Sequence, residues 1–139
     1  MRHENRSIDE WLEVFRSGEK GRNEAGAALV AIGRPAAIPL MSLLKETEAP
    51  ITRAVAASTL CLMRENATEA VSALERSLSR DRDPVVRLRA AQALVGIAGA
   101  THAESVKYLR ETARSADPAL AQWIKADAKI ILRDAGISE

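Results

Sequence analysis

Small apolar residues recur along the chain at the spacing of one helix face. The stretch DRDPVVRLRAAQALVGIAG, residues 81–99, has charged residues in its first half and small apolar residues in its second. Its apolar positions i, i+1, i+4 and i+7 share one stripe of an α-helix. The stripe recurs about every 31 to 34 residues, on Ala25/Gly26/Leu29/Ile32, Ala56/Ala57/Leu60/Met63, Ala90/Ala91/Leu94/Ile97 and Ile124/Lys125/Ala128/Ile131. Four copies predict a helical repeat protein.

The ends of the repeated helices, and a second helix in each repeat, complete the expected pattern. Each copy is followed by a residue that tolerates the left-handed conformation, namely Gly33, Asn66, Gly99 and Gly136. After the first three copies comes a second amphipathic stretch, with the apolar stripes Ile38/Met41, Val71/Leu74/Leu78 and Val106/Leu109/Ala113. Together these patterns predict eight helices, near residues 7–17, 22–33, 35–47, 50–65, 67–80, 84–98, 101–115 and 118–134.

Several helix starts carry recognisable caps. Asp83 precedes Pro84, which suits the first position of a helix because it needs no N–H there. Ser7 with Glu10, and Thr101 with Glu104, have the spacing of a capping box. We therefore expect Asp83, Ser7 and Thr101 to be N-caps.

The D-P-x-V-R…A-A-x-A-L string of residues 83–94 resembles HEAT repeats, especially the short HEAT-like class of phycobilin lyases and bacterial adaptor proteins. Tetratricopeptide repeats share the 34-residue period but require bulky and aromatic residues where Ala56 and Ala57 stand. The resemblance implies an all-α, right-handed α-solenoid of three to four helical hairpins, with second helices on the concave face. It also implies a ladder of turn Asp and helix Arg residues, which Ala49 and Ala121 interrupt.

We expect a single domain over residues 1–139. It comprises an N-terminal capping helix (1–20), repeats at 22–49, 50–83 and 84–117, and a C-terminal partial repeat (118–139). Trp11 shares a helix side with Leu12 and Phe15, which favours packing over partner contact. The third helix is apolar over a wide arc and needs a cover on two sides, either the N-terminal helix or a partner protein.

Composition excludes several function classes. The formal net charge of +1 gives no general attraction to nucleic acid or membranes. The single cysteine, Cys61, excludes an internal disulfide and indicates a packed thiol. His3 and His102 lack metal-ligand spacing. No stretch approaches 18 uncharged apolar residues, so we expect a soluble, cytoplasmic protein without cofactor, metal or membrane contact.

Trp123 and Asp127 form the one pair that suggests catalysis. They lie at i, i+4 on one helix face, and HEAT-like alkylpurine DNA glycosylases, which the repeat pattern resembles, use a Trp and an Asp in a cleft. This helix is terminal, however, with no following wall to make a pocket. We therefore expect Trp123 to cap the end of the core and Asp127 to be solvated.

The preferred interpretation is a non-enzymatic scaffold or adaptor that binds a protein partner on its concave face. Nucleic-acid binding or DNA repair, and an accessory or lyase-like subunit of a cofactor-bearing enzyme, are the alternatives. The chain is expected to be a monomer or to self-associate weakly through the solenoid ends. The residues expected to meet the partner are Ser42, Lys45, Ser72, Arg76, Lys107, Tyr108, Glu111 and Arg114, with Tyr108 foremost because it is a rigid amphipathic ring.

The register of the second helices can be expressed as charge pairs. Matching Val71 to Val106 sets Glu75 beside Arg110 and Arg76 beside Glu111. Exposed pairs of this kind contribute only about 0–1 kcal/mol each, so they indicate register more than stability.

Overall fold

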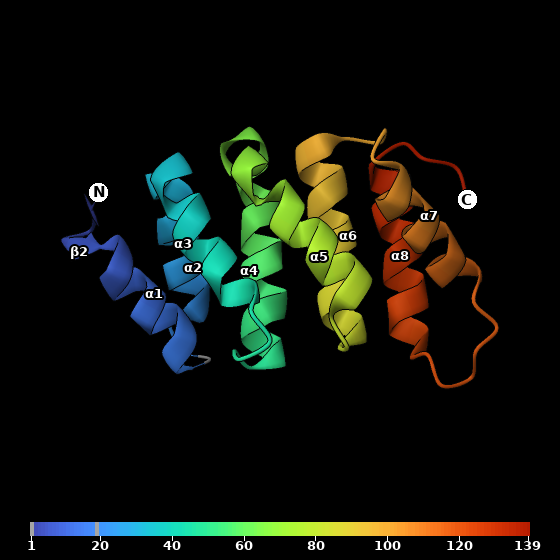
Figure 1. Ribbon diagram of the computed structural model, residues 1–139, viewed down its shortest axis with the longest axis horizontal. Coiled ribbons are helices and arrows are strands. Elements are labelled where there is room, and N and C mark those ends of the chain that lie inside the picture. The colour runs from blue at the N-terminus through green and yellow to red at the C-terminus, as the bar shows by residue number, and fades with distance from the viewer. Residues whose placement is uncertain (1, 19) are drawn as a thin grey trace.

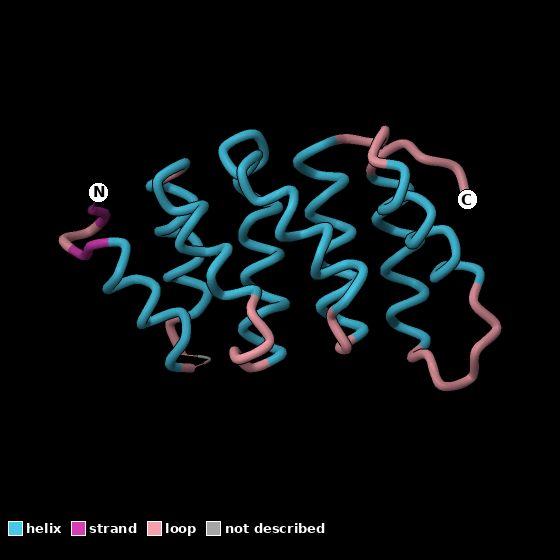
Figure 2. The backbone as a smooth tube through the Cα atoms, viewed as in Figure 1, coloured by secondary structure: helices cyan, strands magenta, loops and turns pink. Residues whose placement is uncertain are grey.

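The computed structural model describes residues 2–18 and 20–139, and almost all of its secondary structure is helical (Figure 2). In chain order the α-helices are α1 (Ile8–Ser17), α2 (Arg22–Ile32), α3 (Ala37–Met41), α4 (Pro50–Met63), α5 (Val71–Arg80), α6 (Pro84–Ala98), α7 (Ala103–Arg114) and α8 (Gln122–Asp134). Three 3₁₀ segments adjoin them, η1 (Arg34–Ala36), η2 (Ser42–Leu44) and η3 (Arg64–Ala70).

The helices form two layers in a row. In Figure 1, α3, α5 and α7 lie in front of α2, α4, α6 and α8, and the two termini lie at opposite ends of the molecule. Helices α4 and α6 pack directly on each other, as do α5 and α6, and α7 and α8. Each second helix therefore lies over the row of first helices, as in an α-solenoid.

The repeated small residues let the first helices approach closely. Ala56 and Ala57 of α4, and Ala90 and Ala91 of α6, are fully buried. Leu60 and Leu94, one repeat apart, are 0% exposed. Alanine side chains let helix axes come close enough for the neighbouring leucines to interlock. The core stripe is confirmed at these positions of α4 and α6, whereas the stripe residues Ile32, Ile97 and Lys125 are only half-buried.

The N-terminal helix packs as expected but begins differently. Trp11 and Phe15 are buried, and Ser7 and Glu10 form the capping box. Before the helix, β1 (Arg2–His3) and β2 (Arg6–Ser7) pair antiparallel, and the indole Nε1 of Trp11 donates to the His3 carbonyl at 2.9 Å. Two-residue strands are too short to show an alternating pattern in the sequence, so this hairpin was not expected.

Three of the four expected left-handed residues have positive φ, namely Gly33 (87°), Gly99 (90°) and Gly136 (72°). The expectation for Asn66 is wrong. Helix α4 already ends at Met63, and the left-handed residue is Arg64, with φ of 53°. The chain then continues through η3, so it needs no further reversal at position 66.

Three expected helices are clearly shorter than the sequence pattern suggested, one of them over 67–80, where α5 begins only at Val71 after η3. The third helix, expected over 35–47, is divided into η1, α3 and η2 and stops at Leu44. Pro39 lies inside it and lacks the N–H that a continuous α-helix would use. The last helix starts at Gln122 instead of residue 118, because the Asp117 carboxylate accepts the Ala119 N–H at 2.9 Å and forms a turn.

The cap of α7 is His102, not Thr101. The Nδ1 of His102 accepts the Ser105 N–H at 3.4 Å and lies 2.8 Å from the Ser105 hydroxyl, while its Nε2 lies 2.9 Å from a Glu75 carboxylate oxygen. Because Nδ1 is the acceptor, Nε2 is the nitrogen that donates to Glu75. His102 thus joins the start of one second helix to the body of the preceding one.

Replacing His102 by alanine is expected to lower the free energy of unfolding by about 0.5–2 kcal/mol, the usual effect of losing an N-cap. Urea denaturation measures it. Thr101→Ala is the control, because Thr101 is exposed and makes no cap bond, and it is expected to change stability by less than about 0.5 kcal/mol. A larger loss for Thr101→Ala would contradict this assignment.

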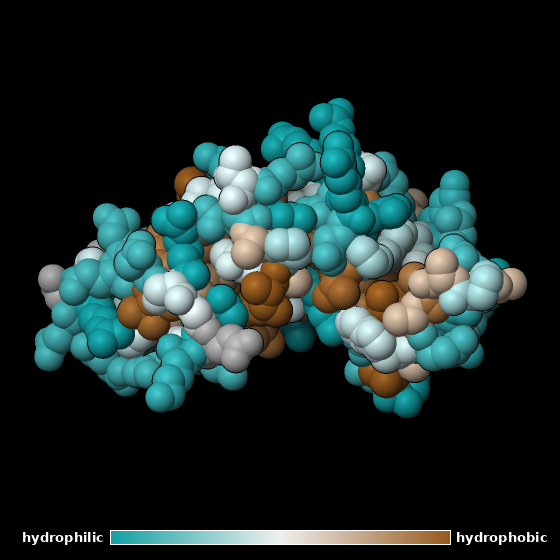
Figure 3. Space-filling view, turned by 90° about the horizontal axis from the view of Figure 1, so that it is seen from below, coloured by the Kyte–Doolittle hydropathy of each residue, from teal (hydrophilic) through white to brown (hydrophobic). Residues whose placement is uncertain are grey.

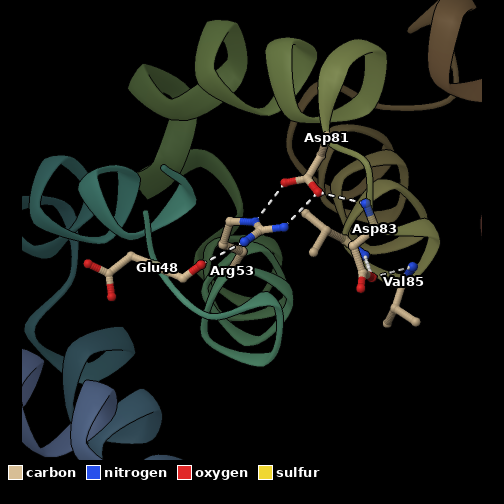
Figure 4. A network of polar contacts seen from close by, with 6 residues as sticks. Glu48, Arg53, Asp81, Asp83 and Val85 are labelled. Carbon is tan, nitrogen blue, oxygen red and sulfur yellow. Dashed lines mark hydrogen bonds and ion pairs between the residues drawn. The ribbon is translucent and has the colours of Figure 1, made fainter. Parts of the chain in front are cut away.

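One buried Asp–Arg pair joins successive repeats, but its carboxylate is Asp81 and not Asp83, the ladder position that Ala49 interrupts one repeat earlier. Figure 4 shows Arg53 of α4 pointing to Asp81 at the end of α5, with distances of 2.8 and 3.0 Å between the paired atoms. Arg53 also donates to the Glu48 carbonyl, and Asp81 accepts the Asp83 N–H at 2.9 Å. Both side chains of the pair are buried.

The equivalent arginine one repeat later forms no ion pair within residues 2–18 and 20–139. Arg87 occupies the place of Arg53 one repeat later, but Ser115 stands where Asp81 would be. Arg87 instead donates to the Leu78 carbonyl at 3.0 Å. Asp83 caps α6 as expected, accepting the N–H groups of Val85 and Val86.

Candidate functional site

A groove of about 590 Å³ lies between α3–η2 and α5, neighbouring elements in the front layer of Figure 1. We call it the α3/α5 groove. One bank carries Ile38, Met41, Ser42 and Lys45, and the other carries Ala73, Arg76, Ser77 and Arg80. Leu44, Glu46 and Asp81 complete the lining.

The two banks have the same spacing. Residues 38, 41, 42 and 45 lie at i, i+3, i+4 and i+7, and so do residues 73, 76, 77 and 80. In the α-helix α5 this spacing places the set along one side of the helix. The other set runs from α3 through η2 to Lys45, and the lining of the groove places it opposite α5. Because α3 and α5 run in the same direction (Figure 1), the two stripes face each other along the length of the groove.

The groove is apolar at one end and charged at the other. Near the starts of the two helices lie Ile38, which is 60% exposed, and Ala73. Near their ends lie Lys45 and Arg80, both exposed, with Arg76 between. Within residues 2–18 and 20–139, none of these three cations forms an ion pair, so their charges remain available to a ligand.

The buried carboxylate at the edge of the groove does not cancel those charges. Asp81 is held by Arg53 in the bidentate pair of Figure 4. The hydrogen bonds to Asp81 raise the pKa of the Arg53 guanidinium, against the opposing effect of burial. Glu46 is therefore the one lining carboxylate without an ion-pair partner among the described residues.

Comparison with known protein families shows which repeat family the helices belong to. Residues 39–128 match the family described as HEAT repeats. The chain belongs to the HEAT repeat family. No curated protein and no solved structure matches the chain in the corresponding comparisons. The HEAT repeat match covers most of both banks of the α3/α5 groove, and such repeats typically serve as protein–protein interaction scaffolds.

Six of the eight residues expected to meet a partner line two hollows of this HEAT repeat protein. Ser42, Lys45 and Arg76 lie in the α3/α5 groove. Lys107, Glu111 and Arg114 line a second hollow of about 440 Å³ beside α7. Ser72 is exposed and lines neither of them.

Tyr108 is half-buried and lines neither hollow. The Arg87 guanidinium lies over its ring, 5.2 Å from the centroid, which is the geometry of a cation–π contact. Burial raises the pKa of the Tyr108 phenol. A role for Tyr108 in partner binding stays a prediction.

The expected charge pairs between second helices are wrong. The carboxylate of Glu75 contacts the Nε2 of His102, the N-cap residue of α7, and not Arg110. Arg110 instead donates to the Ser138 carbonyl at 2.9 Å. Arg76 faces the α3/α5 groove and not Glu111, so its charge is turned toward the preceding repeat.

Trp123 and Asp127 both differ from their expected placement. Trp123 is 50% exposed, so it does not cap the core as expected. Asp127 is not simply solvated either, because Arg89 of α6 donates to it at 2.6 Å. Neither residue lines the two hollows above or a third of about 350 Å³ between the ends of α4, α6 and α8.

Cys61 is a packed thiol at the edge of that third hollow. It is buried, and burial raises the pKa of its thiol. A raised thiol pKa lowers the thiolate fraction, which opposes nucleophilic chemistry.

Among residues 2–18 and 20–139, no three His, Cys, Asp or Glu side chains come together as metal ligands. In the same residues, no helix is long and apolar enough to cross a membrane.

Sequence reasoning missed Ile38 and Arg80 as site residues. Ile38 and Met41 were expected in the core, whereas Ile38 is exposed, Met41 is half-buried, and Leu40, Leu43 and Leu44 pack inward instead. The wide apolar arc of this segment was the available signal. It indicates a surplus of apolar residues that one core-facing stripe cannot accommodate.

Proposed function

We propose that this HEAT repeat protein is a non-enzymatic scaffold or adaptor that holds a segment of a partner protein in the α3/α5 groove. The observation that supports this most is the combination of exposed Ile38 with unpaired Lys45, Arg76 and Arg80 in one hollow. Binding interfaces commonly combine an apolar anchor with a polar, charged rim.

The groove supports binding better than catalysis. Its lining contains no histidine, cysteine or aromatic residue, and its one buried carboxylate is neutralised by Arg53. Short HEAT-like repeats, which this sequence resembles, occur both in phycobilin lyases and in bacterial adaptors. The lining of the α3/α5 groove favours the adaptor role. On the face shown in Figure 3, apolar side chains appear as separate patches among hydrophilic ones.

The test compares partner capture by matched variants. Tagged wild-type protein, Ile38→Asp and Leu62→Asp are incubated with lysate of the cells that express the protein, and retained proteins are quantified by mass spectrometry. Leu62 is the control because it is 65% exposed on α4 and lies outside the groove. We expect a partner that wild type and Leu62→Asp retain equally and that Ile38→Asp retains at least tenfold less.

Two results would contradict the proposal. One is equal capture of every specific partner by Ile38→Asp and wild type, with superimposable melting curves. The other is that the retained material is nucleic acid, released steeply as salt is raised because phosphate contacts release counterions.

A further inference from the structure

The chemistry of the α3/α5 groove indicates what kind of segment it takes. We propose that the occupant of the α3/α5 groove is an acidic segment of a partner protein, an inference that rests on the proposed function. The segment places an apolar side chain at the Ile38 end and carboxylates at the Lys45 and Arg80 end.

The charge of the lining favours a negative occupant. The lining contains three unpaired cations, Lys45, Arg76 and Arg80. Glu46 is the one lining carboxylate that could neutralise them, because Asp81 is already paired with Arg53. A basic segment would bring cations against three unpaired cations, and like charges placed together across an interface are unfavourable. Carboxylates there would form charge-assisted hydrogen bonds with the two guanidinium groups.

The apolar end sets the second requirement. Ile38 is 60% exposed and lies with Met41 and Ala73 on the facing stripes. Covering such a side chain removes apolar surface from water, which stabilises a complex by about 25 cal/mol per Å². A purely polar acidic tail would leave this end uncovered. The occupant therefore needs an apolar residue as well as acids.

The length of the groove sets the spacing between the two features. Ile38 and Lys45 are seven residues apart, and so are Ala73 and Arg80. At the α-helical rise of about 1.5 Å per residue, the apolar and charged ends of the α5 bank lie about 10 Å apart. An extended chain covers this distance in about three residues. The expected occupant thus carries an Asp or Glu about three positions from a Leu, Ile or Met.

The lining also disfavours single-stranded nucleic acid, which shares the negative charge. Such strands are held by bases stacked on aromatic side chains as well as by phosphate contacts. The residues of the groove, all of them within the described part of the chain, include no aromatic side chain. The apolar end would face the sugar–phosphate backbone without a matching group.

The experiment selects peptides from a phage-displayed library of random sequences against the full chain, with Ile38→Asp as the counter-selection. We expect enriched peptides with the acid and apolar spacing above. A synthetic enriched peptide should bind at least tenfold more weakly to Arg76→Ala/Arg80→Ala, as measured by fluorescence anisotropy. Arg114→Ala/Arg133→Ala, which makes the same change in net charge outside the groove, should leave the affinity within about twofold.

The outcomes separate this inference from the proposed function. Enriched peptides that are basic or uncharged but lose binding to Ile38→Asp would overturn the acidic occupant and leave the groove as a protein-binding site. An acidic peptide unaffected by Arg76→Ala/Arg80→Ala would overturn the charge assignment. The acidic occupant and the proposed function are both contradicted if no peptide distinguishes wild type from Ile38→Asp. They are also both contradicted if a labelled single-stranded oligonucleotide binds wild type and loses affinity for Arg76→Ala/Arg80→Ala as the peptide does.

Discussion

Replacing Arg53 by alanine is expected to lower the free energy of unfolding by about 3–5 kcal/mol, the range for removing one partner of a buried ion pair. The substitution leaves the Asp81 carboxylate buried, with the Asp83 N–H as its remaining hydrogen-bond donor. It also removes the bond to the Glu48 carbonyl, which ties the segment after η2 to α4. Urea denaturation followed by circular dichroism measures the change.

Arg87→Ala is the matched control for Arg53. Arg87 occupies the equivalent position one repeat later but contacts the Leu78 carbonyl and the Tyr108 ring instead of a carboxylate. Losing one hydrogen bond and one partly exposed cation–π contact is expected to cost about 1–2 kcal/mol. Equal losses for the two variants would show that the Arg53–Asp81 pair is not the main connection between α4 and the end of α5.

Replacing Leu60 by alanine is expected to cost about 2–5 kcal/mol, as truncation of fully buried leucines does. Leu60 is 0% exposed in the stripe that packs α4 among its neighbours, and Leu94 has the same place in α6. Both variants leave a cavity that closely packed alanine-rich helices cannot fill by small shifts. Leu94→Ala is therefore expected to lose a similar amount in the same urea experiment.

Leu62→Ala provides the control within one helix. It lies two residues from Leu60 but is 65% exposed, so its truncation is expected to change stability by less than about 0.5 kcal/mol. A loss of less than about 0.5 kcal/mol for Leu60→Ala, equal to that of Leu62→Ala, would mean that the core stripe has been assigned to the wrong helix face.

The core of the fold was predictable because it depends on one period. Leu60 and Leu94 were placed correctly from the spacing of small and large apolar residues alone. The exposed position of Ile38 could not be predicted from this spacing, because the third helix includes 3₁₀ segments. A 3₁₀ turn holds 3.0 residues instead of 3.6, so positions beyond it rotate away from the face that an α-helical pattern predicts.

The candidate site was predictable in part. Ser42, Lys45 and Arg76 were expected on the partner-facing side, and they line the same groove. Arg80 was missed because its place depends on how the end of α5 lies against η2, which is a tertiary relation. The cap of α7 was assigned to Thr101 instead of His102, because nothing local in the sequence indicates that Glu75 would lie 2.9 Å from the Nε2 of His102.

The most direct test of the central claim locates a bound partner on the surface. Hydrogen–deuterium exchange is measured on the full chain alone and with the partner that wild type retains and Ile38→Asp loses. We expect slower exchange over residues 37–46 and 71–81, the two banks of the α3/α5 groove, with α8 unchanged. Slower exchange confined to α7, or to the first helices α2, α4, α6 and α8, would contradict the assignment of the α3/α5 groove as the binding site.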